Sequence, residues 1–326
     1  MRTQPPVRPE PRTRTLAASP SLTPLLARGA LLSPLKRPRP DAPVPATRLA
    51  LAGVRVDLAH LAAYERVCGF ATGADALPVT YPHVLAFPLA MRIMTARAFP
   101  LPLLGLVHTS IEITRHQAPA ATAEYELGVL VETLTPHRRG TEATVLTEAR
   151  AHGRLVWESR STYLARHRPH DRALRNTSRA APPEAPHFDP RGATRGTPSG
   201  ASPNTPQAAG SEDRKPLPAV AEWRLARDVG RRYGAVSGDR NPIHLHPLTA
   251  RFFGFPRAIA HGMWTVARCL AEYGPQEAVE VRAEFRAPVP LPGTVTYAAR
   301  GPSFELRGGD RVHLTGDVRP LRARSQ

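Results

Sequence analysis

The chain has 326 residues, among them 37 prolines, and carries a formal net charge of +17. Such a balance is typical of nucleic-acid binders, but residues 1–48, 166–215 and 319–326 together hold +14 of it. The remainder shows no basic helix, no cationic strand interleaved with aromatics and no zinc module, so we expect no nucleic-acid partner. Charges and prolines interrupt the most apolar run, residues 85–107, which excludes a membrane span there. Two cysteines exclude a disulfide framework and favour a reduced, cytoplasmic protein.

The N-terminal residues 1–48 are rich in Pro and Arg, and we expect a flexible arm with a short docking helix over residues 22–35. An Arg-rich start is also typical of a transit peptide, but this one has many prolines and no uninterrupted apolar region. Residues 166–216 are predicted to be a disordered linker rich in Pro, Arg and Ala, and residues 319–326 a basic tail.

Two blocks remain, residues 49–165 and 217–318, and both predict one helix followed by consecutive strands. In the first block a helix is expected at about residues 89–98, and strands at 107–114, 125–132, 142–151 and 155–164. In the second, apolar residues from Met263 to Leu270 follow the i, i+3, i+4, i+7 spacing of an amphipathic helix. Strands are expected at 279–287, 295–297 and 311–318. Such an order is typical of an α+β unit in which an antiparallel sheet wraps one helix.

The two blocks also resemble each other in sequence. A segment from Tyr64 to Phe70 matches the segment from Tyr233 to Asp239, with Tyr, Val, a small residue and Gly in common. A second pair of segments, residues 81–88 and 255–262, shares an aromatic residue, Pro and Ala. In this alignment Phe70 replaces Asp239, and the first block has no counterpart of residues 241–244.

Residues 237–244 of the second block read Ser-Gly-Asp-Arg-Asn-Pro-Ile-His and combine a carboxylate, an amide and an imidazole in a turn. A carboxylate and an imidazole that converge on one substrate can move protons in both directions near neutral pH, which suits addition or removal of water. The alternative is that Asp239 and Asn241 only cap nearby backbone N–H groups. Since the first block lacks Asp239 and His244, the functional interpretation is favoured over a purely structural turn.

The segment His261-Gly262-Met263 begins the amphipathic helix. Backbone N–H groups at a helix N-terminus have no intrahelical partner, so Gly262 can donate to an oxygen that gains negative charge. Glycine also permits close approach to the backbone. The alternative is ordinary close packing at a helix start. The aligned residue in the first block is Pro88, which has no N–H; one functional and one degenerate site are therefore expected.

Residues 233–244 followed by Ala260-His-Gly-Met263 resemble the signature of the MaoC-like hydratase/dehydratase family, the R-specific enoyl-thioester hydratases. The resemblance covers about residues 49–165 and 218–318, as in tandem 3-hydroxyacyl-thioester dehydratases. It implies two hot-dog folds joined edge to edge as a pseudo-dimer, and reversible dehydration of (3R)-3-hydroxyacyl thioesters in fatty-acid metabolism. A monomeric pseudo-dimer or a homodimer is expected.

The resemblance also implies roles for individual residues. Asp239 and His244 would form the catalytic dyad, Asn241 would orient the dyad or the water, and the Gly262 N–H would form the oxyanion hole. The degenerate half would help to hold the acyl chain. Substrate contacts are expected from the following residues: Ser237, Gly238, His261, Phe253 and Phe255. The partner would be acyl-CoA or an acyl carrier protein, and coenzyme A or phosphopantetheine would enter only as part of the substrate, with no other cofactor.

Several alternatives stay open on the residues alone. A hot-dog acyl thioesterase or a non-catalytic acyl-thioester-binding protein would use the same fold. His244 and His246 could bind a metal, but no further ligand lies at suitable spacing, so no metal is expected. Phe252, Phe253 and Phe255 could line an acyl pocket, but aromatic residues that precede a helix more often belong to the core. Cations near the site could meet substrate phosphates or lie in solvent: Arg231, Arg232, Arg240 and Arg257.

Overall fold

The computed structural model describes residues 11–39, 42–167 and 216–321. The predicted linker and the last five residues of the predicted basic tail lie outside the described residues, apart from the linker's ends. Described residues up to 167 and from 217 onwards belong to one compact unit. No helix in the part of the chain that the structure describes is long and apolar enough to cross a membrane.

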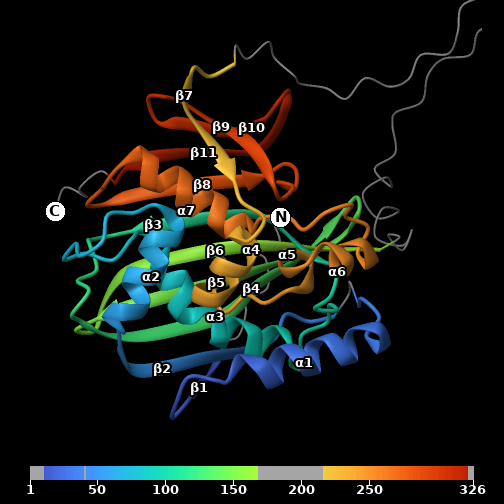
Figure 1. The fold of residues 1–326 in the computed structure, drawn as a ribbon. Coiled ribbons are helices and arrows are strands. Elements are labelled where there is room, and N and C mark those ends of the chain that lie inside the picture. Colours follow the sequence, from blue (N-terminus) through green and yellow to red (C-terminus); the bar gives the residue numbers. More distant parts are fainter. Residues whose placement is uncertain (1–10, 40–41, 168–215, 322–326) are drawn as a thin grey trace, which may run out of the picture. The chain divides into compact units, whose positions relative to one another are not determined.

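Both blocks fold into the same order of elements (Figure 1). The first half contains β2 (Thr47–Arg55), α2 (Leu58–Cys68), α3 (Tyr81–Met94), β3 (Leu106–Arg115), β4 (Glu124–His137), β5 (Gly140–Ala151) and β6 (Arg154–Arg166). The second half contains β7 (Ala219–Leu225), α4 (Val229–Ser237), α5 (Pro242–Leu245), α6 (Pro247–Phe252), α7 (Gly262–Tyr273), β8 (Val279–Phe285), β9 (Gly293–Arg300), β10 (Ser303–Gly308) and β11 (Arg311–Pro320). The second half differs by the insertion of α5 and α6.

The two halves share one 11-stranded sheet in the order β1-β2-β4-β5-β6-β3-β8-β11-β10-β9-β7. Reading outwards from the β3–β8 pair, each half repeats the same strand order, so a pseudo-twofold axis passes between these two strands. Antiparallel pairing from Ser110↔Glu284 to Arg115↔Val279 joins the halves. The predicted edge-to-edge arrangement is therefore confirmed.

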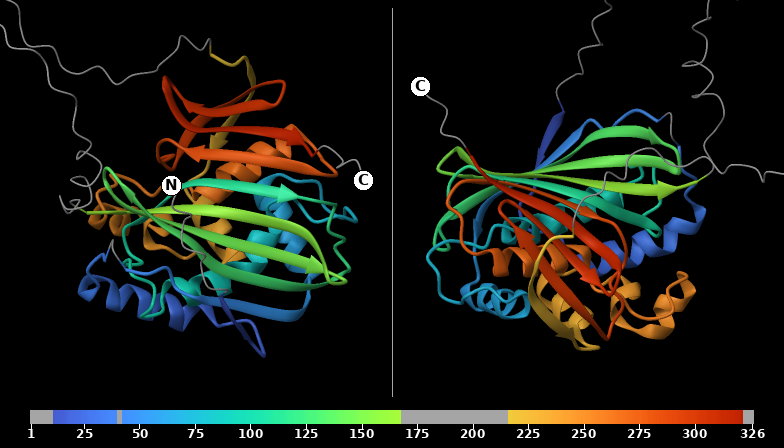
Figure 2. Two further views of the ribbon diagram at one scale, coloured as in Figure 1. Left: turned by 180° about the vertical axis from the view of Figure 1, so that it is seen from behind. Right: turned by 90° about the horizontal axis from the view of Figure 1, so that it is seen from above.

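The central helices α3 and α7 lie on the same face of this sheet (Figure 2). In α7 the predicted apolar stripe of Met263, Val266, Ala267 and Leu270 is buried. The strand β8 alternates buried and more exposed residues, as its period-two pattern predicts. Burial of these apolar faces against one another holds the unit together.

The helix α3 begins eight residues earlier than predicted, at Tyr81. Pro82 lies in its first turn, where a missing N–H costs no intrahelical hydrogen bond, and Pro88 lies inside the helix. Because most of α3 is buried, its sequence has no amphipathic period that could mark its start.

The expectation of a flexible arm is wrong for the described residues 11–39. β1 (Arg12–Thr15) pairs in parallel with β2, and the helix expected over residues 22–35 is present as α1 (Leu22–Leu32) followed by the 3-10 turn η1 (Ser33–Leu35). Gly29 of α1 lies so close to Thr95 and Leu103 that a β-carbon would clash with both. Apolar contacts of this kind, which composition does not reveal, order the arm.

Candidate active site

The turn that carries the predicted dyad begins at the end of α4. Gly238 caps this helix with φ of +76°, a left-handed conformation that favours glycine. The Ser237 hydroxyl accepts a hydrogen bond from the N–H of Asp239 at 3.2 Å. Neither Ser237 nor Gly238 lines the cavity described below, so their observed contacts shape the turn, in contrast to the substrate contacts predicted for them.

Asp239 and Asn241 both accept hydrogen bonds from nearby backbone N–H groups, as the alternative interpretation of the sequence predicted. Asp239 Oδ1 accepts from the N–H of Asn241 at 3.1 Å, and Asn241 Oδ1 accepts from the N–H of Ile243 at 3.4 Å. Asn241 thereby caps α5. Asp239 Oδ2 makes no such contact, and the Asp239 side chain keeps about a third of its surface exposed. Local capping therefore occupies one oxygen of this carboxylate and leaves the other open to a ligand.

His244 lies in α5 and is buried, with 8% of its surface exposed. Its Nδ1 lies 2.8 Å from the carbonyl oxygen of Ile259, and since a carbonyl only accepts, Nδ1 carries the hydrogen. Burial lowers the pKa of His244 below its usual 6.5, an effect that the charge of Asp239 partly opposes. The imidazole is therefore neutral near pH 7, with Nε2 as a free proton acceptor.

His261 packs directly against this imidazole. The two rings stack with centroids 3.7 Å apart, and His261 Nε2 donates to the backbone carbonyl of Asp239 at 2.9 Å. Burial lowers the pKa of His261 to about 3. A neutral His261 thus links the turn at Asp239 to the ring of His244 and fixes their relative position.

Asp239, His244 and His261 each offer one ligand-type atom, and these atoms all lie within 4.8 Å of one another. A water molecule or a substrate hydroxyl can form hydrogen bonds to two atoms at such a separation. Three such side chains could also hold a metal ion, a grouping that differs from the His244 and His246 pair considered from the sequence. His246 instead caps α6 through its Nδ1.

Gly262 is the first residue of α7, and its neighbour His261 makes no side-chain capping bond there. The N–H of a first helical residue has no intrahelical partner and is free to donate. A β-carbon at Gly262 would come within 2.8 Å of the Phe285 ring. Glycine is therefore required by close packing as well as suited to approach by a ligand.

The sequence alignment of Gly262 with Pro88 is wrong. Just before each central helix, one backbone N–H donates to a carbonyl oxygen further along the chain. In the second half Ala260 donates to Val289, and in the first half Leu77 donates to Pro119. Two residues further on, Gly262 corresponds to Val79, which has an N–H. The first half therefore does not lack a backbone donor at this position. It differs from the second half in lacking counterparts of Asp239 and His244. In the first half the corresponding turn begins after α2 at Gly69, which has the same left-handed conformation as Gly238.

One cavity of about 820 Å³ brings these groups together. Asp239, Asn241, His244, His261 and Gly262 all line it. Its apolar lining comes from both halves and from α1, and the part from α1 and the first half includes Leu26, Ala30, Phe87, Met91, Met94, Leu103 and Leu106. The cavity is thus built from both halves, although only the second half supplies the predicted dyad.

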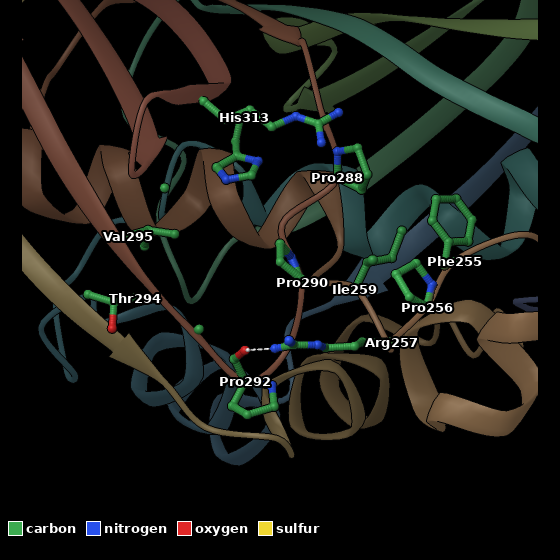
Figure 3. Close-up of a pocket in the computed structure, with 13 residues that line it drawn as sticks. Phe255, Pro256, Arg257, Ile259, Pro288, Pro290, Pro292, Thr294, Val295 and His313 are labelled. Atoms are coloured by element: carbon green, nitrogen blue, oxygen red, sulfur yellow. Dashed lines mark hydrogen bonds between the residues drawn. The ribbon is translucent and has the colours of Figure 1, made fainter.

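The two predicted aromatic residues lie in different places. Phe255 lines the large cavity, whereas Phe253 does not and keeps 39% of its surface exposed. Phe255 also borders a second cavity of about 390 Å³ (Figure 3). Four residues line both cavities and form the wall between them: Phe255, Ile259, Pro288 and His313.

Sequence reasoning missed several polar residues of the first half that line the large cavity, among them His83, His108 and Tyr163. Tyr163 and His108 lie on neighbouring strands, β6 and β3, that pair at this position. No sequence motif marks these three residues. The pairing of β3 with β6 brings His108 and Tyr163 to the site, and the position of α3 brings His83.

Five arginines also line the large cavity, and four of these were not singled out from the sequence. Arg138, Arg139 and Arg166 come from the first half, and Arg240 and Arg286 from the second. All five side chains are exposed. Of the other arginines considered from the sequence, Arg257 borders the smaller cavity and donates to Pro292 O at 3.5 Å, whereas Arg231 and Arg232 line neither.

Comparison with known proteins places this site in a family. Residues 209–302 match the MaoC like domain. The chain is 34% identical over 274 residues to the protein named 3-hydroxyacyl-thioester dehydratase X of Mycobacterium tuberculosis, covering 82% of this chain and 86% of that protein.

Solved structures agree with this match. A crystal structure of HtdX from Mycobacterium tuberculosis superimposes with a TM-score of 0.66 and 30% identity, over 84% of this chain and 100% of that one. A MaoC-like dehydratase from Phytophthora capsici has the same fold, with a TM-score of 0.60 and 16% identity over 86% of this chain and 96% of that one. The chain therefore belongs to the MaoC-like dehydratase family, the hydro-lyases of the hot-dog fold.

Proposed function

We propose that the protein catalyses the reversible dehydration of (3R)-3-hydroxyacyl thioesters to trans-2-enoyl thioesters in fatty-acid metabolism. The observation that carries this proposal is the convergence, on one cavity, of a carboxylate, a neutral imidazole with a free Nε2 and a helix N-terminal N–H. Acid–base chemistry and stabilisation of developing oxygen charge are the two requirements of water addition next to a thioester.

In the hydration direction a water oxygen bonds to the β-carbon. His244 Nε2 takes a proton from that water, because Nδ1 is already committed to Ile259. The thioester carbonyl gains enolate character and accepts the N–H of Gly262. The dyad then delivers a proton to the α-carbon, so that H and OH have been added across the double bond and the enzyme regains its starting protonation state.

Asp239 Oδ2 would hold the water or the substrate hydroxyl, and Asn241 would keep the turn in place. The exposed arginines of the cavity suit the phosphates of coenzyme A or of a carrier protein's phosphopantetheine arm. The proposed chemistry needs no redox group and no metal, and coenzyme A or phosphopantetheine enters only as part of the substrate.

Two substitutions test the dyad. Asp239→Asn and His244→Ala should each lower kcat for hydration of crotonyl-CoA by about 10²- to 10⁴-fold, the usual contribution of a positioned acid or base. Asp310→Asn and His116→Ala are the matched controls, because both residues are exposed and lie outside the cavity lining. Near-normal turnover in either dyad variant, with the fold intact, would rule out the assignment.

The reaction type is tested on the same wild-type protein. Loss of enoyl absorbance without release of free thiol supports hydration, whereas equimolar free thiol would identify a thioesterase. A chiral assay of the 3-hydroxy product should give the (R) form; an (S) product would contradict the proposed stereochemistry.

A further inference from the structure

The large cavity contains a second group of polar side chains, which comes entirely from the half without the dyad. The His108 ring stacks on Tyr163 with centroids 4.5 Å apart and on His83 at 6.4 Å. All three side chains line the cavity, and together they are called the polar cluster below. Nothing in the proposed reaction uses them, so their presence in the cavity wall needs another explanation.

The polar cluster contains imidazole nitrogens that have lost water without gaining a protein partner. His83 Nδ1 and His108 Nε2 are shielded from solvent and form no hydrogen bond with any residue that the structure describes. Burying a polar atom in this way is unfavourable unless a partner satisfies it. A bound oxygen would remove that cost once the two rings turn these nitrogens, which present almost no surface to the cavity, towards it.

The charge state of the polar cluster limits what such a group can be. Burial lowers the pKa of His83 to about 4 and that of His108 to about 3, so both rings are neutral near pH 7. Neutral imidazoles and a phenol offer hydrogen bonds but no positive charge for a buried carboxylate. An uncharged oxygen, such as a ketone or a hydroxyl, fits this environment.

The position of the polar cluster relates it to the reacting carbons. The ring of Phe285 packs against Gly262 on one side and lies 4.8 Å from the His108 ring on the other. The charge of Asp239 also acts on His83. The polar cluster is therefore adjacent to the place where the thioester carbonyl and the double bond would lie.

Beyond the polar cluster the cavity becomes apolar along one helix. His83, Phe87, Met91 and Met94 of α3 all line it, at the i, i+4, i+8 and i+11 spacing of one helical face. At 1.5 Å per residue these four side chains span about 16 Å. An acyl chain that follows this face meets polar groups first and purely apolar groups afterwards.

We propose that this enzyme takes acyl thioesters with an uncharged oxygen, a ketone or a hydroxyl, close to the reacting carbons and an unsubstituted apolar tail beyond it. His83, His108 and Tyr163 hydrogen-bond that oxygen, and Phe87, Met91 and Met94 pack against the tail. This inference rests on the proposed dehydration. It gives the first half a specific task, recognition of an oxygenated chain, beyond holding an alkyl chain.

The test compares trans-2-decenoyl-CoA with two analogues that carry a ketone on the δ- or the ε-carbon. The wild-type protein should hydrate at least one ketone analogue with a kcat/KM about ten-fold above that of the unsubstituted chain, which corresponds to about 1.4 kcal/mol. Tyr163→Phe and His108→Phe, which keep ring size but remove the polar atoms, should bring this ratio close to one. Tyr273→Phe, a tyrosine outside the cavity lining, should leave the ratio as in the wild type.

A wild-type ratio of one or less for both analogues would overturn the inference and would mean that the polar cluster only holds water. An unchanged ratio in both ring variants would overturn it as well. Calorimetric binding of decanoyl-CoA and its two oxo analogues, which cannot be hydrated, provides a readout independent of turnover. Tighter binding of an oxo analogue supports the inference even if hydration fails, whereas failure to hydrate any of the enoyl substrates overturns the proposed function.

Discussion

Gly230 lies where α4 crosses the backbone of His244, and replacing it with alanine tests whether that contact sets the position of the dyad. A β-carbon at Gly230 would overlap the carbonyl oxygen of His244 and lie 3.0 Å from its carbonyl carbon. Carbon atoms in contact prefer about 3.5–4.0 Å. Because an ordinary carbon–oxygen contact is about 3.3 Å, either α4 or the backbone of His244 must therefore move by about 1 Å or more.

Such a displacement acts on chemistry more than on stability. A 1 Å misplacement of a reacting group can cost about 10²-fold in rate, so we expect kcat/KM for crotonyl-CoA hydration to fall by about 10- to 100-fold in Gly230→Ala. Overpacking lowers the free energy of unfolding by about 1–3 kcal/mol. The better helix propensity of alanine offsets up to about 1 kcal/mol of this loss.

The control lies on the same helix. Ala235 is exposed, and Ala235→Gly should lower stability by up to about 1 kcal/mol without moving His244. Both variants are measured for Tm and for kcat/KM under conditions where each is fully folded. The reasoning is refuted if Gly230→Ala, although folded, keeps wild-type kcat/KM, or if Ala235→Gly loses as much activity as Gly230→Ala.

Three further predictions concern pH, metal and chain length. First, because the folded pKa of His83 is about 4 against 6.5, the unfolded chain binds more protons between these values, so the free energy of unfolding falls as pH drops from 6.5 to 4. His83 alone contributes about 3 kcal/mol to this loss, and chemical denaturation of His83→Phe across this range should show a shallower pH dependence; an identical slope would contradict the burial argument. Second, dialysis against a chelator should leave hydration activity unchanged, and loss that zinc restores would assign Asp239, His244 and His261 to a metal site. Third, Leu26→Ala removes apolar surface from the cavity. Each lost carbon that contacts the acyl tail is worth about 0.8 kcal/mol, so loss of one such contact should raise KM several-fold for long enoyl thioesters and less for crotonyl-CoA; an equal rise for both would show that Leu26 does not face the acyl tail.

The sequence was most informative where a single periodic pattern or a local motif determines structure. The alternation in β8 and the apolar stripe of α7 predicted those elements closely, because each has one buried and one exposed face. The residues from Asp239 to His244 lie in one short turn, so their proximity follows from chain connectivity alone. Their partner His261 comes to the turn through the fold, but its place before a helix start was visible in the sequence.

Elements without a period were not predictable in the same way. The helix α3 is buried over most of its surface, so no apolar stripe marks its start. The wrong match between Pro88 and Gly262 rested on the few residues that segments 81–88 and 255–262 share in sequence. The polar cluster depends on two paired strands and a helix, which no local pattern of His83, His108 or Tyr163 encodes. The strand β1 forms through pairing with β2, a contact that composition cannot show.

The pairing of β3 with β8 affects how the second half would behave as a separate fragment. In a fragment of residues 217–321, the N–H and C=O groups of β8 that now pair with β3 would have no partner. The apolar face beside α3 and β3 would also be uncovered. A second copy of the fragment offers the identical strand in antiparallel orientation. The fragment would therefore tend to form a symmetric dimer with two dyads, neither of which would have His83, Met91 or Met94 in its cavity. In the proposed enzyme, the absence of the dyad from the first half lets one substrate chain contact two different cavity walls, which a symmetric dimer of identical halves would not provide.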